Sequence, residues 1–319
     1  MNEHPILEVQ NLKKYFNCKG NFQVKAVDDV SFIIYPNEIL GLVGESGSGK
    51  TTLARSIMRL YQPTEGDILF EEKSIYSLSK KEKLELCRKM QYIFQDPYSS
   101  LDPRMTIQEI ITEPLTIHNM LHQKKRSTRA EELLKLVGLQ SATLSQFPHQ
   151  LSGGQRQRIG IARALALNPR FIVCDEPIAS LDVSIQAQII NLLRTLQEEM
   201  GLTFLFISHD LAVVRYISNR VAVMYHGHLV ELAPSRELYE TPLHPYTSTL
   251  LTIVPIPCPE IEKKRSTSIS ITRNIPISTQ PSQGCVFHHQ CPKAMPICQK
   301  VRPKWKEFSP GHYVACHLI

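Results

Sequence analysis

Apolar and polar residues alternate along the first part of the chain in the way that is typical of β-strands. Strand-like alternation occurs at residues 6–9, 24–27 and 30–34, and residues 66–70 have the pattern of another short strand. The polar, glycine-containing stretch 17–21 predicts a turn after the first of them. The pattern therefore predicts a β-rich segment at the start of the chain.

Beyond residue 80 the pattern switches between helical and strand-like spacing. Ile107, Ile111 and Leu115 have the spacing of one helix face within a long helical stretch. The expected helices span residues 80–89, 102–139 (continuing at 128–137), 151–166 and 184–200, and the expected strands span residues 90–94, 171–174 and 203–207. Strands that alternate with helices predict an α/β fold with a mainly parallel sheet covered on both faces.

The composition changes after residue 254. A proline-rich stretch is followed by charged, Ser/Thr-rich residues, 263–279, which have little capacity to form a core. We therefore expect a main domain over residues 1–254. Residues 255–319 are expected to form a linker and a small cysteine-bearing extension.

Composition and charge exclude several classes of protein. The 319 residues are 42% hydrophobic and 21% charged, as in a globular protein. No apolar stretch approaches the ~20 residues needed to cross a bilayer, and residues 1–5 lack the pattern of a secretory signal. We expect a cytoplasmic chain that reaches a membrane only through a partner. The net charge of +6 is modest, and the lysine clusters lack interleaved aromatic residues, which disfavours nucleic-acid binding.

The candidate chemistry begins at residues 44–51, which fit the phosphate-binding pattern G-x-x-x-x-G-K-[ST]. A strand-like run precedes the pattern and a helical run follows it. The glycines allow the backbone to curl its N–H groups onto an anion, at the positive end of the following helix. Lys50 can reach the β- and γ-phosphates of a nucleotide, and the Thr51 hydroxyl can ligate Mg²⁺. A glycine-rich turn that contains a lysine by coincidence is the weaker interpretation, because the flanking strand, the helix and all four fixed positions are present.

Polar and acidic residues follow three further predicted strands. Asp175 and Glu176 end an apolar strand, where the aspartate can hold the Mg²⁺ shell and the glutamate can polarise an attacking water. His209 and Gln95 also follow predicted strands, at the carboxyl ends where ligands gather in doubly wound sheets. On spacing alone, a structural role for His209 or Gln95 is an equal alternative to nucleotide contact.

Residues 151–155, Leu-Ser-Gly-Gly-Gln, resemble the signature motif of ATP-binding cassette (ABC) ATPases. From residue 6 to about 235 the motifs follow that family's order, namely the phosphate loop, Gln95, the signature, Asp175-Glu176, Leu181-Asp182 and His209. Three segments resemble more narrowly the ATPase subunits of bacterial oligopeptide and dipeptide importers: residues 94–105, 182–188 and 242–247. One departure is the order Ala-Ser-Leu-Asp at residues 179–182, where the family has Ser-Ala-Leu-Asp. We expect this small-for-small exchange to leave hydrolysis intact.

The resemblance implies an ABC-ATPase fold: a RecA-like, mainly parallel sheet, an N-terminal antiparallel β subdomain, an inserted helical subdomain at about residues 96–165 and a small C-terminal extension. It implies that Glu176 is the general base and His209 the γ-phosphate sensor, with Gln95 and Lys50 as the other catalytic residues. It implies Mg²⁺ ligation by Thr51, Gln95 and Asp175. For ATP it implies adenine stacking on Phe16 (or its neighbour Tyr15), phosphate contacts from Gly44, Glu45, Ser46, Gly47, Ser48, Gly49, Lys50, Thr51 and Thr52, and contacts across a head-to-tail dimer from Ser152, Gly153, Gly154, Gln155 and Asp182.

Cys285, Cys291, Cys298 and Cys316 gather near the end of the chain. In a cytosolic protein such thiols favour metal or cluster ligation over disulfides, although their spacing is not that of a zinc ribbon. Importer ATPases carry a similar element that holds an iron–sulfur cluster in some members, so the resemblance implies a [4Fe–4S] cluster on these four thiolates. A compact tail with unligated buried thiols is the alternative.

The resemblance finally implies a function. The chain is expected to hydrolyse ATP and so to drive uptake of oligopeptides or dipeptides, as a peripheral subunit on the cytoplasmic face of the inner (plasma) membrane. The expected partners are a paralogous ATPase subunit, in preference to a second copy, two integral membrane permease subunits and, indirectly, a periplasmic or lipoprotein solute-binding protein. The alternatives are an importer ATPase for nickel or another small solute, a soluble ABC ATPase acting on nucleic acid or ribosomes, and a non-catalytic cassette.

Overall fold

The computed structural model describes residues 4–18, 22–96, 98, 100–252 and 283–319 of the 319-residue chain. The predicted linker therefore lies outside the described residues, as does part of the predicted turn at 17–21. Within the described part, none of the helices combines the length and the apolar character that a membrane span requires.

A four-stranded antiparallel sheet forms the N-terminal part, in the order β2-β1-β4-β5. Its strands are β1 (Leu7–Cys18), β2 (Phe22–Ile34), β4 (Glu65–Phe70) and β5 (Lys73–Ser74). The strand stretches expected at 24–27 and 30–34 are both present, and they form a single strand, because β2 runs through both. Register shifts in the pairing of β1 with β2 interrupt the simple alternation, and Asn11 of β1 and Asp29 of β2 have φ values of 45° and 63°.

The second sheet has eight strands in the order β11-β12-β10-β9-β3-β8-β7-β6. Its strands are β3 (Ile39–Val43), β6 (Met90–Ile93), β7 (Phe171–Asp175), β8 (Thr203–Ile207), β9 (Arg220–Tyr225), β10 (His228–Pro234), β11 (Lys306–Ser309) and β12 (His312–Val314). The five strands from β9 to β6 pair in parallel, and β10, β12 and β11 extend the sheet antiparallel. The predicted α/β fold with a mainly parallel sheet is confirmed.

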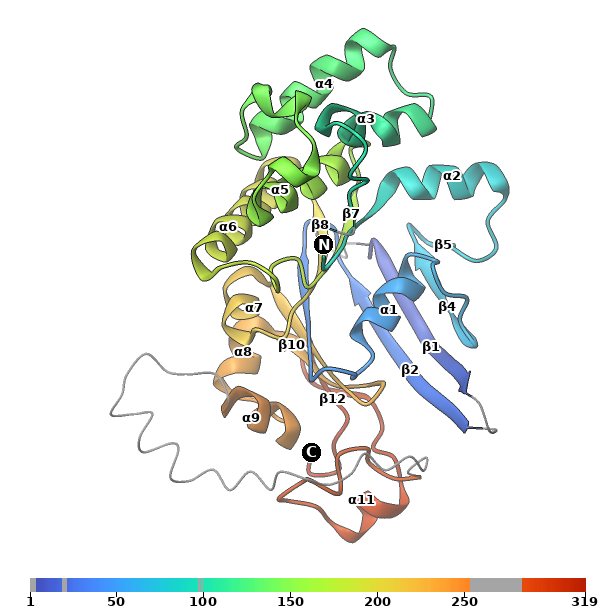
Figure 1. The fold of residues 1–319 in the computed structure, drawn as a ribbon. Coiled ribbons are helices and arrows are strands. Elements are labelled where there is room, and N and C mark those ends of the chain that lie inside the picture. The colour runs from blue at the N-terminus through green and yellow to red at the C-terminus, as the bar shows by residue number, and fades with distance from the viewer. Residues whose placement is uncertain (1–3, 19–21, 97, 99, 253–282) are drawn as a thin grey trace.

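Helices cover the large sheet (Figure 1). The helices between residues 107 and 217 share one hydrophobic core and are called the helical layer. The helices are α1 (Lys50–Ile57), α2 (Lys80–Lys89), α3 (Ile107–Ile117), α4 (Gln123–Leu136), α5 (Gly153–Leu165), α6 (Val183–Met200), α7 (Leu211–Ile217), α8 (Ser235–Glu240), α9 (Pro245–Thr252) and α11 (Pro296–Lys300), with 3-10 turns η1 (Ser141–Ser145) and η2 (Pro148–Gln150). The continuous helical stretch predicted over 102–139 is wrong, because the chain breaks into α3 and α4. Capping boxes explain the sharp starts of α2, α3 and α5, since Ser79, Thr106 and Ser152 each exchange hydrogen bonds with the residue three positions later.

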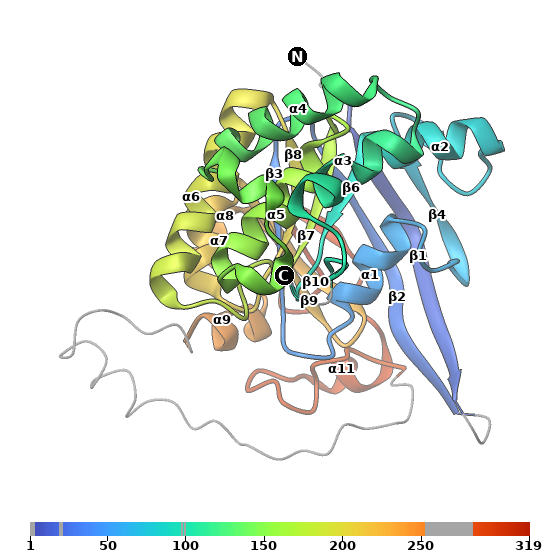
Figure 2. The ribbon, with the colours of Figure 1, turned by 45° about the horizontal axis from the view of Figure 1, so that its top comes forward.

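The parallel strands are buried on both faces. Leu40 and Leu42 of β3 join a core shared with the antiparallel sheet and α1, whereas Ile39 and Val43 join a core shared with the helical layer. Successive side chains of a strand point to opposite faces, so a strand between two cores must be apolar throughout. Figure 2 shows α5, α6 and α7 on one side of the large sheet and the antiparallel sheet on the other.

The C-terminal extension belongs to the large sheet. Strand β12 pairs with β10 through Glu231↔Val314 and Leu232↔Tyr313, and β11 pairs with β12. A hairpin that lies far along the sequence thus completes the edge of the main domain (Figure 1). The sequence pattern alone did not indicate this pairing.

Candidate functional site

The phosphate loop, residues 44–51, connects β3 to α1 and is curled as the sequence predicts. A Cβ added to Gly44 would lie 2.1 Å from the carbonyl oxygen of Met224, and one on Gly49 would lie 2.0 Å from that of Ala26. Both glycines have positive φ values, 152° and 106°. Only glycine can take these positions, because neighbouring backbone occupies the space of a side chain.

Lys50 is 5% exposed and folds back over the loop. Its Nζ donates to the carbonyl oxygens of Gly44 at 2.8 Å and Glu45 at 2.9 Å. Burial lowers the pKa of this amine, while the charges of Glu176 and Asp175 act to raise it. A phosphate oxygen is a stronger acceptor than a carbonyl, so an anion entering the loop can draw this ammonium group onto itself.

Asp175 accepts hydrogen bonds from two other elements at the end of β7, where the sequence predicts a magnesium site. Its Oδ1 accepts from Thr51 Oγ1 at 3.1 Å, and its Oδ2 accepts from the Tyr92 hydroxyl at 2.6 Å. The residue is only 3% exposed, and a buried carboxylate needs a compensating cation. Hydroxyl and carboxylate oxygens are ligands that Mg²⁺ prefers, so this donor set fits the ion that accompanies ATP.

Glu176 lies at the centre of a second cluster. Gln95 Nε2 donates to Glu176 Oε2 at 2.9 Å, and His209 Nδ1 lies 3.4 Å from the same oxygen. The side chain of His209 is 61% exposed, whereas that of Glu176 is 18% exposed and therefore mostly buried. Glu176 has φ of 47° and its N–H donates to the Ile207 carbonyl at 3.0 Å. This backbone conformation costs a non-glycine residue free energy and occurs at functional sites, although ten other described non-glycine residues also have positive φ values.

The remaining predicted phosphate-contact residues of this chain lie in the loop and in the first turn of α1. Glu45, Ser46, Gly47 and Ser48 belong to the loop, and Thr52 belongs to α1. The ends of three strands, β6, β7 and β8, lie together beside the loop that follows β3. The predicted convergence of Lys50, Thr51, Asp175, Glu176, Gln95 and His209 is present.

Phe16 and Tyr15 are neighbours on β1, and their side chains make different contacts. The Phe16 ring packs edge-on against Tyr61 with centroids 5.4 Å apart, and Lys14 Nζ lies 5.0 Å from the Phe16 ring. The Tyr15 hydroxyl instead donates to Asp28 at 2.5 Å. Of the two aromatic residues that the sequence proposed for adenine, Tyr15 is therefore tied to a carboxylate through its hydroxyl, whereas Phe16 makes ring contacts only.

The signature residues lie at the start of α5. Ser152 caps this helix, and Gln155 completes the capping box. A Cβ on Gly154 would lie 2.5 Å from Ile185, so α5 packs closely on the start of α6, where exposed Asp182 stands without a side-chain capping bond. Among the described residues, no hydrogen bond joins Ser152, Gly153 or Gly154 to the phosphate loop of the same chain.

Tyr92 is a site residue that sequence reasoning missed. The sequence pattern places it only within a strand, yet its hydroxyl donates to Asp175. In the parallel pairing of β6 and β7, Tyr92 lies beside Val173, two residues before the aspartate. The available signal was a polar-tipped aromatic residue three positions before Gln95 at the same edge of the sheet.

The four cysteines share one small module but do not form a ligand set. Cys285 and Cys298 are buried, and the Cys285 N–H donates to the Cys298 carbonyl at 2.8 Å. Burial raises the pKa values of Cys285 (to about 11), Cys291 and Cys316. Over the part of the chain that the structure covers, no three His, Cys, Asp or Glu side chains are arranged to hold a metal ion. The arrangement therefore gives no support to the predicted [4Fe–4S] cluster.

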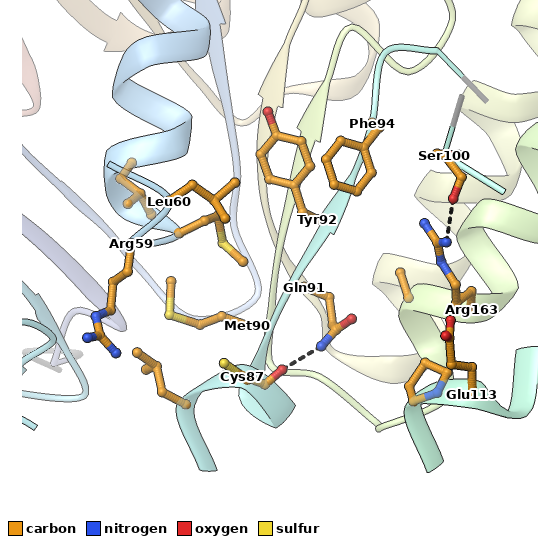
Figure 3. A pocket seen from close by; sticks show the side chains of 15 residues that line it. Arg59, Leu60, Cys87, Met90, Gln91, Tyr92, Phe94, Ser100, Glu113 and Arg163 are labelled. Atoms are coloured by element: carbon orange, nitrogen blue, oxygen red, sulfur yellow. Dashed lines mark hydrogen bonds between the residues drawn. The ribbon is translucent and has the colours of Figure 1, made fainter. Parts of the chain in front are cut away.

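A groove of about 690 Å³ opens beside the site, between α1, α2 and β6 on one side and the helical layer on the other. Tyr92 and Phe94 line it with ring centroids 4.6 Å apart, and Leu60 and Phe94 are 58% and 42% exposed (Figure 3). Arg163 of α5 lies at the other end, where it donates to the Ser100 carbonyl at 2.6 Å. The Tyr92 ring faces this groove while its hydroxyl contacts Asp175.

Comparison with known proteins agrees with this geometry. Residues 27–179 match the family described as ABC transporter, and residues 230–298 match that described as oligopeptide/dipeptide transporter, C-terminal region. In Bacillus subtilis (strain 168), the oligopeptide transport ATP-binding protein AppF is 52% identical over 324 residues, covering 99% of this chain and 98% of AppF. The oligopeptide transport ATP-binding protein OppF of the same strain is 51% identical over 314 residues, covering 98% of this chain and 96% of OppF.

Solved structures resemble the cassette portion. The ATP-binding cassette MJ0796, as a post-hydrolysis dimer bound to ADP and Pi, is 33% identical with a TM-score of 0.66, covering 72% of this chain and 99% of that one. The cbiO1 protein of Clostridium perfringens, part of the ABC transporter complex cbiONQ, is 28% identical with a TM-score of 0.66, covering 75% and 92%. From its phosphate loop to its C-terminal hairpin, this chain belongs to the ATPases of the ABC transporters, in the oligopeptide/dipeptide transporter family.

Proposed function

We propose that this chain is the ATP-hydrolysing subunit of an importer that takes oligopeptides or dipeptides across the cytoplasmic membrane. The convergence of Lys50, Asp175 and Glu176 on one loop is the observation that carries the hydrolytic part. The peptide part is supported by the C-terminal family match and by the names of the relatives.

The residues divide the work of hydrolysis between them. The loop N–H groups and Lys50 would bind the phosphates, and Thr51 and Asp175 would hold Mg²⁺. Glu176 accepts the proton of the attacking water, with Gln95 and His209 orienting the water and the γ-phosphate. Mg²⁺, when bound, neutralises charge that develops between the β- and γ-phosphates.

A second subunit completes the site. The signature residues Ser152, Gly153 and Gly154 are at the start of α5, which is an anion-binding position, and the first two are exposed. Among the described residues, none of the three is bonded to the loop of its own chain. A head-to-tail pair places them over the partner's nucleotide, with Asp182 at the junction. We propose a paralogous ATPase chain as the partner. The expected results are that mixing the two chains raises the ATP turnover and that the chain alone remains slow.

The groove is the proposed docking site for a permease subunit. A short cytoplasmic helix that presents apolar side chains fits exposed Leu60 and Phe94, and the groove adjoins both Gln95 and Tyr92. Such a contact attaches the chain to the cytoplasmic face of the membrane. It also places the permease one side chain away from Asp175.

The substitution Glu176→Gln tests the hydrolytic role. It keeps the shape of the side chain but removes the base, so we expect ATP turnover to fall by at least about 100-fold. ATP binding should persist, because the phosphates are held by the loop. Equal turnover by the variant and the wild type, measured with the partner chain present, would contradict the assignment.

The substitution Leu60→Glu tests the docking site. A charge on the apolar wall of the groove should abolish co-purification with the permease subunits, because burying it in the contact is costly. Leu136→Glu, at a 37% exposed leucine of α4, is the matched control. Retention of the permease by the Leu60 variant would place the docking surface elsewhere.

Two further points are open to direct measurement. Iron and acid-labile sulfide in anaerobically purified protein would support the predicted cluster on Cys285, Cys291, Cys298 and Cys316, and their absence would favour plain buried thiols.

Uptake of labelled peptides, compared with uptake of nickel in cells lacking the chain, distinguishes the proposed solute from the alternative.

A further inference from the structure

The segment 242–247, Pro-Leu-His-Pro-Tyr-Thr, marks the importer resemblance but has no part in the function proposed above. In the structure its tyrosine touches the phosphate loop. The hydroxyl of Tyr246 accepts a hydrogen bond from the backbone N–H of Glu45 at 3.1 Å, across 201 residues of sequence. Tyr246 is 2% exposed, so this contact is a buried and specific one.

The same peptide unit is held from its other end. The carbonyl of Gly44 and the N–H of Glu45 belong to one planar peptide group. Lys50 Nζ donates to that carbonyl at 2.8 Å, while Tyr246 accepts from that N–H. When Lys50 leaves the Gly44 carbonyl for a phosphate, the hydrogen bond to Tyr246 still fixes the orientation of the peptide group between Gly44 and Glu45, at the start of the phosphate loop.

Tyr246 is itself held rigidly by its own segment. Its backbone N–H donates to His244 Nδ1 at 3.0 Å, and the N–H of His244 donates to the buried carboxylate of Glu231 at 2.9 Å. Glu231 is 0% exposed and also lies 2.8 Å from His312 Nε2 in β12. The position of the Tyr246 hydroxyl therefore depends on a hydrogen-bond network that extends to His312 in the C-terminal hairpin.

The cysteine module supplies the packing around the ring. Phe287, which is 3% exposed, contacts Tyr246 at 5.4 Å and Tyr225 at 5.3 Å between ring centroids. Tyr225 and Tyr246 also contact each other at 4.5 Å. Phe287 lies two residues after Cys285, so this module forms one wall of the tyrosine's pocket.

We propose that Tyr246 is a positioning residue for the phosphate loop, and that the cysteine-bearing extension holds it in place through Phe287 and His312. The inference rests on the proposed assignment of residues 44–51 as the nucleotide site. It predicts that loss of the Tyr246 hydroxyl weakens ATP binding but does not slow the bond-breaking step. ATP affinity depends on the loop that Tyr246 holds, whereas the bond-breaking step depends on Glu176, Gln95 and His209 at other strand ends.

The test is Tyr246→Phe in the full-length chain, with ATP as the probe. The change removes the hydroxyl and keeps the ring. The loss of one buried hydrogen bond predicts a 3- to 10-fold rise, as an order of magnitude, in the Kd for ATP and in the KM of the complex with the partner chain. We expect kcat to change less than about 2-fold, since the transition-state contacts are intact.

Tyr239→Phe is the matched control, because its hydroxyl donates to the Leu211 carbonyl at 2.5 Å, away from the loop. It should leave the Kd and the KM unchanged. Phe287→Leu keeps the Tyr246 hydroxyl but loosens the packing around the Tyr246 ring. It should also raise the Kd for ATP, by a smaller factor than Tyr246→Phe. This variant also decides the question if Tyr246→Phe does not fold.

The outcomes separate this inference from the proposed function. ATP binding that is lost in Lys50→Ala but unchanged in Tyr246→Phe and Phe287→Leu would overturn the role of Tyr246 alone. A fall in kcat at unchanged KM in Tyr246→Phe would overturn it too. A wild-type chain that binds no ATP would overturn the loop assignment and this inference together.

Discussion

At the scale of single residues, Asp175 is oriented both by a residue of the predicted metal-binding set and by a residue outside it. Tyr92 donates to Asp175 from one side while Thr51 donates from the other. Burial strongly raises the pKa of the Tyr92 hydroxyl, so it remains a donor at any physiological pH. The carboxylate is therefore oriented by a neutral group on the neighbouring strand as well as by the loop.

Tyr92→Phe should weaken this orientation. We expect the Mg²⁺ concentration for half-maximal ATP hydrolysis to rise by roughly 2- to 5-fold, because one charge-assisted hydrogen bond to the metal-binding carboxylate is lost. Tyr76→Phe is the control, since that hydroxyl donates to the Ser56 carbonyl at 2.7 Å instead. An unchanged Mg²⁺ dependence would show that Thr51 alone is sufficient to orient Asp175.

At the scale of elements, α5 contains two glycines, and helix packing requires only one of them to be glycine. Gly154 lies 2.5 Å, measured from an ideal Cβ, from the branched Ile185 side chain of α6. Gly160 is on the same helix, and a Cβ there would meet no heavy atom within 4 Å. The first glycine permits the close approach of two helices, whereas the second only lowers the helix propensity.

Substitution by alanine should therefore have opposite effects at the two positions. Gly160→Ala should raise the free energy of unfolding by about 0.5–1 kcal/mol, because glycine in a helix interior costs that amount relative to alanine. Gly154→Ala should lower it by about 1–3 kcal/mol, since the added methyl group overpacks the contact with Ile185. Urea unfolding of both variants measures the difference. A stabilised Gly154 variant would show that α6 shifts freely.

At the scale of the whole molecule, the extension is joined to the cassette at several distant places. Strand β12 pairs with β10, Arg302 reaches Asp28 of β2 at 3.3 Å, and His312 contacts Glu231 at 2.8 Å. Two buried histidines accompany these contacts. Burial lowers the pKa values of His244 and His228 to about 4, with the charge of Arg302 adding to the effect at His228.

These histidines predict loss of stability in acid. Their pKa values are lower in the folded chain than the value of 6.5 expected on unfolding, so the unfolded chain binds more protons between pH 6.5 and 4. The free energy of unfolding should fall through this range as the pH decreases, by on the order of 3 kcal/mol per histidine at pH 4. Urea unfolding at pH 7, 6 and 5 measures the slope.

His244→Asn provides the specific control for this acid sensitivity. The asparagine oxygen can still accept from the Tyr246 N–H but does not titrate, so the slope should become shallower. His289→Asn, at an exposed position, should leave the slope unchanged. A slope that is the same in all three proteins would assign the acid sensitivity to carboxylates instead.

Much of the fold and of the nucleotide site followed from the sequence. The phosphate loop, the acidic end of β7 and the capped start of α5 are local patterns, in which the residues that define the motif also determine the local structure. Apolar runs identified β7 and β8 because a strand between two cores cannot alternate. The length of β2 was missed because irregular pairing and an exposed face interrupt its pattern.

Tertiary structure alone decided the contacts between distant segments. The Tyr92 hydroxyl reaches Asp175 across 83 residues and Tyr246 reaches Glu45 across 201, and no local spacing encodes either approach. The place of β12 beside β10 is likewise a matter of sheet assembly. The sequence by itself determined which chemical groups are present and which local backbone carries them. Packing determined which groups meet, because burial brings residues together according to shape and polarity rather than their order in the chain.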